Sequence, residues 1–294
     1  MGVLQAPKLV ALQHNCAKGG QVLEAVLETA VQKGADLVLI QEPRGETEKD
    51  STSSHHSFRF IRGKEGEAAK CWVAINRESQ CKVTELKDLT RDCANYTQAL
   101  EVKPPSGASY IIVNVYDCGR QGGSRERLAQ RANWEAITRH SQVIIAGDMN
   151  AHSHMWNGRV TSRRNAPFWE NLISDHSLVV WNSEEATRVG SDNHSIINLT
   201  LSSPGVELNW SIHSEEATSS DHEVIMWEIL GATPNIRDSS KEVTGWDISG
   251  WSGAGRSEEE QKAAREKEVA AQQCYLRSGK ETAALNDTSS AEQV

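Results

Sequence analysis

The sequence contains no long apolar run. Its longest runs, such as residues 37–40, fall far short of the roughly 20 apolar residues that a membrane-spanning helix needs. Met1 and Gly2 are followed by Ala6, where a myristoylation signal requires serine or threonine. We therefore expect neither a membrane span nor a lipid anchor.

Cysteine pairs are also missing. The six cysteines form no CxxC pair and show no regular spacing, so the sequence predicts neither a zinc finger nor a disulfide framework. The first residues do not combine a basic segment with an apolar one, as a secretory leader does. These absences predict reduced thiols and an intracellular location.

The chain has no excess of positive charge, because its formal net charge is −9 at pH 7. A protein that coats nucleic acid over a broad surface is basic, so this class of protein is disfavoured. A nuclease stays open, provided that local basic clusters and a divalent cation bind phosphate. With 294 residues, of which 38% are hydrophobic, the chain can form one large α/β domain or two small ones.

The beginning of the chain predicts a strand, a helix and a second strand. Residues 8–13 and 36–41 are largely apolar, as buried strands are. Between them, residues 21–33 place apolar side chains at positions i, i+4 and i+8 of one helical face, and Gly34 follows where helices often end on glycine. This order predicts two parallel strands joined by a right-handed crossover.

Short strands separated by turn residues follow. Several come in succession without intervening helices, at residues 58–62, 71–76, 81–86, 96–103 and 110–116. Such close spacing indicates antiparallel pairing. Helices are expected at residues 124–139 and 166–174, and further strands at 143–146, 178–181, 196–201, 207–212 and 223–229.

These elements predict an α/β fold in which two mainly antiparallel sheets pack face to face, with helices outside. We assign residues 1–230 to this single domain. Residues 231–294 are rich in glycine, serine and charged residues, and we expect a linker followed by a weakly ordered helical tail. Trp246 and Trp251 in this tail either pack on the domain or mark the surface of a partner.

The strand in the middle of the domain leads into a motif that can carry chemistry. Residues 143–146 are apolar, and Gly147, Asp148 and Asn150 follow. In open α/β sheets, ligands bind at the carboxyl ends of strands, and residues two apart on an extended chain point the same way. A carboxylate beside a neutral amide suits metal-assisted phosphate chemistry, although the same residues could form a polar turn that closes the strand.

Other polar side chains stand at strand ends in remote parts of the chain. Asn15 and Glu42 follow the first two strands, Tyr116 ends the series of short strands, and Asp221 and His222 precede the last strand. Each alone fits a turn, a solvated strand end or a half-buried aromatic. Together with the Gly-Asp-x-Asn motif, they supply a carboxylate for a metal, amides for phosphate, a phenol and an imidazole. This is the set of groups that hydrolyses a phosphodiester.

The motifs resemble those of the endonuclease/exonuclease/phosphatase superfamily, and within it the endonuclease domains of non-LTR retrotransposons, relatives of the apurinic/apyrimidinic endonucleases. The resemblance covers most of the first 230 residues. It is carried, in order, by Leu12-Gln13-His14-Asn15, residues 36–43 (DLVLIQEP), residues 111–116 (IIVNVY), residues 146–152 (AGDMNAH) with Trp156, residues 195–201 (SIINLTL) and Ser220-Asp221-His222. The superfamily implies a four-layered α/β sandwich, in agreement with the pattern of elements.

The resemblance also implies a metal site. Glu42 would be the principal ligand of a Mg²⁺ or Mn²⁺ ion, with Asn15 nearby and Asp221 in support. Carboxylate and amide oxygens are the ligands that these hard cations prefer. No small-molecule cofactor is expected.

The same resemblance implies roles for the remaining polar residues. Asp148 would orient or deprotonate the attacking water, Asn150 and Tyr116 would hold the scissile phosphate, and His222 would contact the phosphate or act as acid or base. Preorganised groups of this kind offset the charge that builds at phosphorus, which is usually the largest single term in catalysis.

One residue departs from the family pattern. The family usually carries an aspartate at the position of Asn198, and the resemblance implies that this carboxylate helps to arrange the catalytic groups around His222. An amide can hold the imidazole ring, but it cannot stabilise an imidazolium as a carboxylate does. We therefore expect impaired activity, unless Asp192 substitutes for the missing carboxylate.

Two clusters of arginines follow strands of the expected site. Either they form a solvated surface or they bind DNA phosphates on both sides of the cut. The candidates for DNA binding are Arg120, Arg125 and Arg127, beside Arg131, in the first cluster and Arg159, Arg163 and Arg164 in the second.

Two further side-chain groups lie near the second arginine cluster. His152 and His154 form an H-x-H pattern, but further zinc ligands at a suitable spacing are missing. Trp156 could stack on a base or simply pack in the domain.

The resulting hypothesis is a divalent-metal-dependent DNA endonuclease of the retrotransposon type, which nicks one strand, leaves a 3′-hydroxyl and acts in the nucleus. DNA is the expected partner, and we expect no reverse transcriptase within this chain. Two alternatives stay open. One is a phosphatase or phosphodiesterase that acts on small phosphoesters, and the other is a catalytically inactive DNA-binding module, which Asn198 would explain.

Overall fold

Two β-sheets form the centre of the fold. The structure is a computed structural model, and it describes residues 9–44, 55–63, 69–118, 127–163, 165–190, 194–214 and 219–230. The chain divides into two units, Met1–Ala232 and Thr233–Val294, and every described residue belongs to the first. The predicted tail, residues 231–294, lies outside the described residues, so the boundary and the character of the tail stay predictions.

Each main sheet contains six strands. The first has the order β13-β14-β1-β2-β4-β3 and the second has the order β5-β6-β7-β8-β12-β9. The strands of the first sheet are β1 (Val10–Asn15), β2 (Leu37–Gln41), β3 (Phe58–Arg62), β4 (Cys71–Asn76), β13 (Leu208–His213) and β14 (Val224–Ile229). Those of the second are β5 (Lys82–Glu85), β6 (Thr97–Lys103), β7 (Tyr110–Tyr116), β8 (Val143–Asp148), β9 (Val179–Val180) and β12 (Asn198–Ser202).

Both sheets are mainly antiparallel, as the sequence predicts. The exceptions are one parallel pair in each sheet, β1 with β2 and β7 with β8. A separate small ribbon pairs β10 (Arg188–Val189) with β11 (His194–Ser195), which the sequence pattern did not predict. Parallel neighbours end at the same edge of a sheet. The carboxyl ends of β1 and β2 therefore lie side by side, and so do those of β7 and β8.

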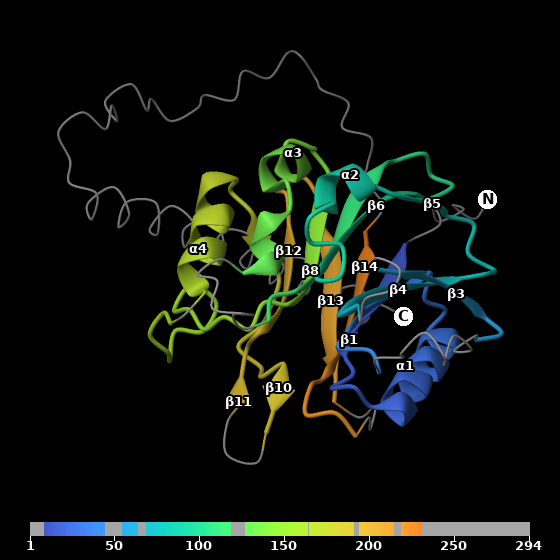
Figure 1. The fold of residues 1–294 in the computed structure, drawn as a ribbon, viewed down its shortest axis with the longest axis horizontal. Helices are drawn as coiled ribbons and strands as arrows, with labels where there is room; N and C mark the ends of the chain where they lie inside the picture. Colours follow the sequence, from blue (N-terminus) through green and yellow to red (C-terminus); the bar gives the residue numbers. More distant parts are fainter. Residues whose placement is uncertain are drawn as a thin grey trace, which may run out of the picture. The chain divides into compact units, whose positions relative to one another are not determined.

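The predicted opening unit is confirmed. Helix α1 (Gly20–Gln32) connects the parallel strands β1 and β2. Gly34 follows with a φ of +66°, a backbone conformation that favours glycine. The buried face of α1 includes Val26 and Leu27, which belong to the same apolar cluster as Leu12 and Val38 of the sheet. Helix α1 thereby covers one face of the first sheet (Figure 1).

The predicted helix over residues 124–139 is wrong in its described part. The chain forms a 3₁₀ turn, η2 (Leu128–Arg131), and then a separate short helix, α3 (Trp134–Thr138). Ala132 between them is extended, with φ −60° and ψ 152°. Asn133 begins α3, because its side chain accepts a hydrogen bond from the Ala136 N–H at 3.1 Å. An N-cap of this kind starts a new helix rather than continuing an old one.

The remaining helices are α2 (Lys87–Thr90) and α4 (Ala166–Asp175). Helices α3 and α4 contact each other through aromatic rings, with the Trp134 and Trp169 centroids 5.4 Å apart. Figure 1 shows α3 and α4 beside the second sheet and α1 beside the first. The order of layers is therefore helix, sheet, sheet, helix, which confirms the predicted four-layered sandwich.

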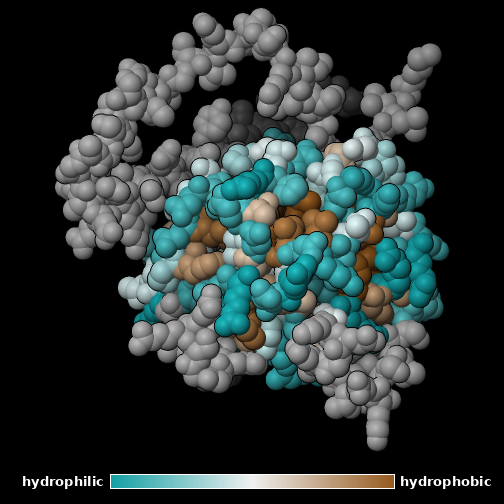
Figure 2. Space-filling model, turned by 45° about the horizontal axis from the view of Figure 1, so that its top comes forward, coloured by the Kyte–Doolittle hydropathy of each residue, from teal (hydrophilic) through white to brown (hydrophobic). Residues whose placement is uncertain are grey.

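The main core lies between the two sheets. Leu39 and Trp227 of the first sheet belong to the same buried cluster as Ile112 and Ile144 of the second. Around this core, the face shown in Figure 2 is mostly hydrophilic, with hydrophobic residues showing through in patches. In the described part of the chain, none of the helices combines the length and the apolar character that crossing a bilayer requires.

Candidate active site

The space between the sheets changes from apolar to polar towards the carboxyl ends of the central parallel strands. On β1, Ala11 belongs to the core, while Gln13 and Asn15 follow on the same face. On β2, Leu39 is followed in the same way by Gln41. The same change occurs from Ile112 to Asn114 and Tyr116 on β7 and from Ala146 to Asp148 on β8. The antiparallel β12 adds two further buried polar residues, Thr200 and Asn198.

Amide side chains join the two sheets in this polar region. Gln41 Nε2 donates to Asn114 Oδ1 at 2.7 Å, and Gln13 Nε2 donates to the carbonyl of Gly147 at 3.1 Å. At the outer end, Asn15 Nδ2 donates to Asp148 Oδ2 at 2.8 Å. Two residues that the sequence placed at separate strand ends are thereby brought into direct contact.

Asp148 is the buried centre of the site. Its second oxygen, Oδ1, accepts a hydrogen bond from the Asn150 N–H at 2.9 Å. Burial raises the pKa of Asp148 to about 7, although the hydrogen bonds from Asn150 and Asn15 favour the carboxylate. A carboxyl group with a pKa near neutrality can accept a proton at physiological pH and give it up again.

Gly147 brings the phenol of Tyr116 alongside Asp148. Tyr116 and Asp148 are paired in the parallel ladder of β7 and β8. Gly147, one residue before Asp148, has a φ of +153°, and a Cβ atom there would lie 1.9 Å from the carbonyl oxygen of Val115. The close approach of the two strands therefore requires glycine at this position.

Glu42 follows β2 in a left-handed backbone conformation, with a φ of 45°. Its backbone is held on both sides, because the Glu42 N–H donates to Lys70 and the Glu42 carbonyl accepts from Lys18, both at 2.9 Å. The side chain is 19% exposed, with Oε1 lying 3.8 Å from Lys18 Nζ. Burial, together with the charge of Glu42 and a hydrogen bond to it, raises the pKa of Tyr116. Glu42 and Tyr116 are thus neighbours, and strained backbone of this kind is common at functional sites.

His222 is held by Asn198, the residue that departs from the family pattern. Asn198 Oδ1 lies 3.0 Å from His222 Nδ1, and because a carbonyl oxygen only accepts, Nδ1 carries the proton and Nε2 keeps its lone pair. Asn198 Nδ2 is buried and has no hydrogen-bond partner among the residues that the structure describes. Burial lowers the pKa of His222 to about 4, and the charge of Asp221 offsets this only in part. The imidazole is therefore neutral near pH 7.

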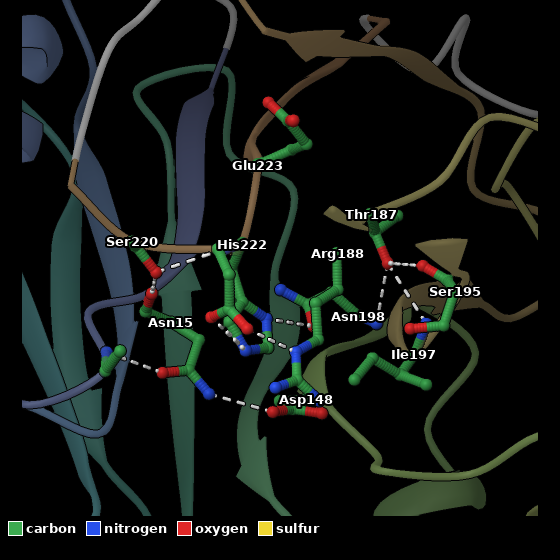
Figure 3. Close-up of polar contacts among 12 residues, drawn as sticks. Asn15, Asp148, Thr187, Arg188, Ser195, Ile197, Asn198, Ser220, His222 and Glu223 are labelled. Carbon is green, nitrogen blue, oxygen red and sulfur yellow. Dashed lines mark hydrogen bonds and ion pairs between the residues drawn. The ribbon is translucent and has the colours of Figure 1, made fainter. Parts of the chain in front are cut away.

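Asp221 is joined to an arginine that the sequence analysis did not select. Arg188 Nε donates to Asp221 Oδ2 at 2.7 Å, and the two side chains are 44% and 34% exposed. Although burial favours its neutral form, Asp221 has a lowered pKa because Arg188 and His222 lie beside it. Figure 3 shows the Arg188 side chain extending from β10 towards Asp148, between His222 and Asn198. No motif marked this residue, since the two-residue strand that carries it is too short to show a periodic pattern.

Asp117 is a second residue that the sequence analysis missed. It is fully buried directly after Tyr116. Its Oδ2 atom accepts hydrogen bonds from Asn165 Nδ2 at 2.9 Å and Trp169 Nε1 at 3.0 Å, and its N–H donates to the carbonyl of Asp148 at 2.8 Å. A buried aspartate after an apolar strand, followed by a tryptophan-containing helix, was the available signal. Asp117 ties the ends of β7 and β8 to α4.

The arginines selected for DNA binding fall into different environments. Arg127 is only 13% exposed, and its Nη1 atom lies 3.6 Å from Asp117 Oδ1. Its charge is therefore paired with that of Asp117 inside the protein. Arg159 and Arg163 are exposed on the segment after β8, and Arg159 Nη2 is 4.0 Å from Glu184. Outside the described residues lie three of the selected arginines and the alternative carboxylate, namely Arg120, Arg125, Arg164 and Asp192.

The loop after Asn150 contains the H-x-H pattern and the tryptophan of the motif. His154 Nδ1 is hydrogen-bonded to Ser162 Oγ at 2.9 Å, and His152 forms a β-bridge with Arg163. Trp156 is buried and donates from Nε1 to the carbonyl of Ile196 at 3.1 Å. Of the two roles considered for Trp156, the structure therefore shows packing.

A second group of potential ligands lies away from these residues, on α1 and the segment before β3. The ligand atoms of Glu28, His55 and His56 lie within 4.8 Å of one another. His55 Nδ1 accepts from the Ser57 N–H at 3.2 Å, so Nε2 carries the proton and donates to Glu28 Oε1 at 3.3 Å. The hydrogen bonds of His55 leave no lone pair for a metal, and the group is better explained as a connection between the loop and α1.

The fold and the site together define a class of protein. Two face-to-face sheets flanked by helices carry carboxylates, amides, a phenol and an imidazole at the carboxyl ends of their parallel pairs. This is the endonuclease/exonuclease/phosphatase fold, as the sequence resemblance implied.

Comparisons with known proteins agree with this class. Residues 110–226 match the sequence profile of the endonuclease-reverse transcriptase family, which confirms the resemblance on which the predictions were based. No curated protein matches the chain in a sequence comparison.

Solved structures with the same fold come from several kinds of protein. The endonuclease domain of TRAS1, a telomere-specific non-LTR retrotransposon, is 18% identical with a TM-score of 0.60, covering 76% of this chain and 98% of that one. The APE2 catalytic domain from Xenopus laevis is 13% identical with a TM-score of 0.54, covering 75% and 91%. The 3′-5′ exonuclease NExo from Neisseria meningitidis is 13% identical with a TM-score of 0.53, covering 75% and 99%. At such identities the likeness establishes the fold.

Proposed function

We propose that this protein is a metal-dependent hydrolase of phosphodiesters that nicks DNA as a retrotransposon-type endonuclease and leaves a 3′-hydroxyl. The observation that supports this most directly is the contact between Asn15 and Asp148, at 2.8 Å across the two sheets. Tyr116 with Glu42 adjoins Asp148 on one side and Asn198 with His222 on the other. A single phosphate could contact all of these groups.

The residues present fit a divalent cation of the magnesium type. Glu42 offers a partly exposed carboxylate. The side-chain oxygen of Asn15 accepts a hydrogen bond from the Ala17 N–H at 2.9 Å and has a second lone pair for a cation. Glu42 and Asn15 would hold the ion, and Asp221, one of whose oxygens is bonded to Arg188, would support it through its charge rather than as a ligand. When bound, a Mg²⁺ or Mn²⁺ ion would neutralise negative charge on the phosphate as the reaction proceeds.

The side chains of the protein transfer protons and bind the phosphate. Asp148, with a pKa near 7, takes the proton of the attacking water as the water oxygen bonds to phosphorus and the bond from phosphorus to the 3′-oxygen breaks. The 3′-oxygen leaves as a hydroxyl with a proton from solvent. Asn15 and the Asn150 N–H hold the Asp148 carboxylate in place. Tyr116 keeps its proton, because its pKa is raised, and donates a hydrogen bond to the phosphate together with the Asn150 amide. His222, neutral and with Nε2 unprotonated, accepts a hydrogen bond rather than supplying a positive charge.

DNA is the proposed substrate because of the rim of the site and the nature of the similar structures. Arg159 and Arg163 are exposed on the loop that follows Asn150, where they would contact backbone phosphates. One of the similar structures is the 3′ phosphatase NExo bound to product DNA hairpin, and another is a retrotransposon endonuclease. We place the activity in the nucleus for the same reason.

A catalytically inactive DNA-binding module is the second candidate function, and Asn198 favours it. The amide leaves its Nδ2 atom without a partner among the described residues. It also gives His222 no anion that would stabilise an imidazolium. In serine proteases, the comparable exchange of an aspartate for asparagine lowers turnover by about 10⁴-fold.

A supercoiled-plasmid nicking assay tests both candidates. Wild type, Glu42→Ala and Asn198→Asp are compared in Mg²⁺, Mn²⁺ and EDTA, with Glu78→Gln, an exposed carboxylate outside the site, as the matched control. We expect cation-dependent nicking by wild type, none by Glu42→Ala, and faster nicking by Asn198→Asp. Protein that retards DNA without ever nicking it would favour the inactive module, and activity confined to a small phosphoester would favour a phosphatase.

A further inference from the structure

The backbone of Arg188 is fixed between two segments that belong to the site. On one side Arg188 pairs with Ser195 of β11, and on the other it forms a β-bridge with His222. The flanking hydrogen bonds run from the Val189 N–H to Asp221 at 2.7 Å and from the Glu223 N–H to Thr187 at 2.9 Å. The position of the Arg188 side chain is therefore set by the same backbone that positions His222.

The guanidinium of Arg188 lies among the negatively charged groups of the site. Its Nε atom donates to Asp221 Oδ2 at 2.7 Å, and its charge acts on both Asp148 and His222. Among the described residues, the guanidinium donates a hydrogen bond to Asp221 alone, through Nε. Figure 3 shows the end of the Arg188 guanidinium beside Asp148, and the side chain as a whole is 44% exposed.

The simplest explanation of this contact is a structural ion pair, but such a pair would add little to the stability of the fold. An ion pair as exposed as that of Arg188 and Asp221 contributes little to stability. The site, in contrast, already gathers the carboxylates of Glu42, Asp148 and Asp221, and a DNA phosphate adds a further negative charge. Like charges a few ångströms apart repel one another near a protein surface, so a fixed cation at this point favours binding of the phosphate.

The pair also limits where a divalent cation can bind. Asp221 Oδ2 is occupied by Arg188, and Oδ1 lies 3.7 Å from His222 Nε2. A second cation on the Asp221 side would meet the positive guanidinium. The side of the site formed by Glu42 and Asn15 is free of this repulsion.

We propose that Arg188 is a phosphate-binding residue of the active site, in which Asp221 anchors Nε and the terminal nitrogens contact the scissile phosphodiester. This inference rests on the proposed function, since it assumes a nucleic-acid phosphate in the site. Arginine suits the role because its planar fork can bind a carboxylate and a phosphate at the same time. In this arrangement Arg188 offsets the negative charge of the phosphate on the Asp221 side of the site. A bound metal would do the same on the Glu42 side.

Three variants test the proposal in the full chain. Arg188→Gln removes the charge, Arg188→Lys keeps the charge without the fork, and Arg139→Gln is the matched control. Arg139 is also an arginine in an ion pair, 3.0 Å from Glu135, but it lies on the exposed end of α3. Binding to a 20-base-pair duplex is measured by fluorescence anisotropy in EDTA over a range of salt concentrations, and nicking is measured in Mg²⁺.

We expect Arg188→Gln to weaken DNA binding and to reduce the slope of log affinity against log salt by about 0.9, the contribution of one phosphate contact. Arg188→Lys should restore most of the slope. Nicking by Arg188→Gln should fall by about 10²- to 10³-fold in kcat, with partial recovery in Arg188→Lys. Arg139→Gln should match wild type in both measurements.

The salt slope separates this proposal from the proposed function. Wild type that binds the duplex but never nicks it refutes the endonuclease activity, while the slope of Arg188→Gln still decides the role of Arg188. If Arg188→Gln keeps the wild-type slope and affinity and loses only thermal stability, Arg188 is a structural residue and the proposal is wrong. Wild type without salt-dependent DNA binding would overturn both.

Discussion

The two ends of the space between the sheets are built by the same strands, yet they serve opposite purposes. In the apolar half, side chains such as Leu39, Ile112 and Trp227 are buried against one another, and each contributes stability without needing a specific direction. In the polar half, side chains such as Gln41 and Asp148 are just as buried, but each needs a correctly placed partner. Burial of side chains therefore stabilises the fold in the apolar half, whereas the polar half forms the site at a loss of stability.

The polar half is incompletely satisfied. Gln41 Oε1 and Asn198 Nδ2 are buried without hydrogen-bond partners among the described residues, and such groups cost about 1–3 kcal/mol each. The left-handed backbones of Glu42 and Asn150 add to this cost. Substitutions in the two halves should accordingly differ in whether they affect folding or activity.

The largest effect is expected where the two halves meet. Gly147 lies between Ala146 of the apolar half and Asp148 of the polar half, and a Cβ atom there would lie 1.9 Å from the Val115 carbonyl oxygen. Gly147→Ala would force β7 and β8 apart, and we expect a loss of more than about 4 kcal/mol, enough to prevent folding. Circular dichroism and the yield of soluble protein measure this.

Gly158→Ala is the matched control for this substitution. Gly158 lies in the loop after β8, and a Cβ atom there would meet nothing within 4 Å. The control should leave stability unchanged within about 0.5 kcal/mol. A folded Gly147→Ala protein with normal stability would show that the strands can separate, and the close approach would then not be essential.

Asp117→Asn should have the next largest effect, because Asp117 joins the site to the helices outside. The substitution removes the charge opposite Arg127 and replaces one carboxylate oxygen with an NH2 group, which cannot accept hydrogen bonds. Breaking a buried ion pair costs about 3–5 kcal/mol. Urea unfolding should show a loss of this size, against less than about 1 kcal/mol for Glu135→Gln, whose ion pair with Arg139 is exposed. Equal losses in the two variants would argue against a buried network at Asp117.

A matched pair on β2 compares the two halves directly. Leu39→Ala leaves a cavity in the apolar half and should cost about 2–5 kcal/mol, with normal nicking by the folded fraction. Gln41→Ala removes the bond to Asn114, together with the buried oxygen that has no partner, and should cost only about 1 kcal/mol. It should nevertheless slow nicking, because Glu42 follows directly. The comparison fails if Leu39→Ala lowers kcat as much as Gln41→Ala does.

The fold was largely predictable because alternation and spacing are local signals. Three strands, Phe58–Arg62, Cys71–Asn76 and Tyr110–Tyr116, begin and end where the sequence predicted. The single helix expected over residues 124–139 failed because the N-cap at Asn133 overrides a continuous apolar pattern. The ribbon of β10 and β11 was missed because strands of two residues carry no period.

The candidate site was predictable only in part, since its residues come from separate strands. Asn15 and Asp148 could be selected because each follows a strong strand, but their hydrogen bond across the sheets depends on how the sheets pack. The sequence predicts Arg127 as a DNA-binding cation, whereas its side chain is largely buried against Asp117. Arg188 was passed over although it reaches the site. The sequence gives no measure of which charge faces inward, and that choice is made by tertiary packing.

The last prediction concerns a change of stability with pH and two buried histidines, His14 on β1 and His222 of the site. Burial lowers the pKa of His14 and of His222 to about 4, below the unfolded value near 6.5. Their contribution to stability is therefore full above pH 6.5 and is lost as the pH falls towards 4, by about 1.4 kcal/mol per pH unit for each group. Asp148 acts in the opposite direction, because its raised pKa of about 7 makes its contribution disappear as the pH rises from about 4 to 7.

Two histidines outweigh one aspartate, so these three groups should make the metal-free protein more stable as the pH rises from 4.5 to 6.5. His14→Gln removes one histidine and should bring their combined slope close to zero. The free energy of unfolding is measured with urea in EDTA at several pH values, and the difference between wild type and variant should change by about 1.4 kcal/mol per pH unit. A difference that stays constant across this range would mean that His14 titrates normally in the folded protein. The surroundings of His14 on β1 would then be more accessible to water than its burial indicates.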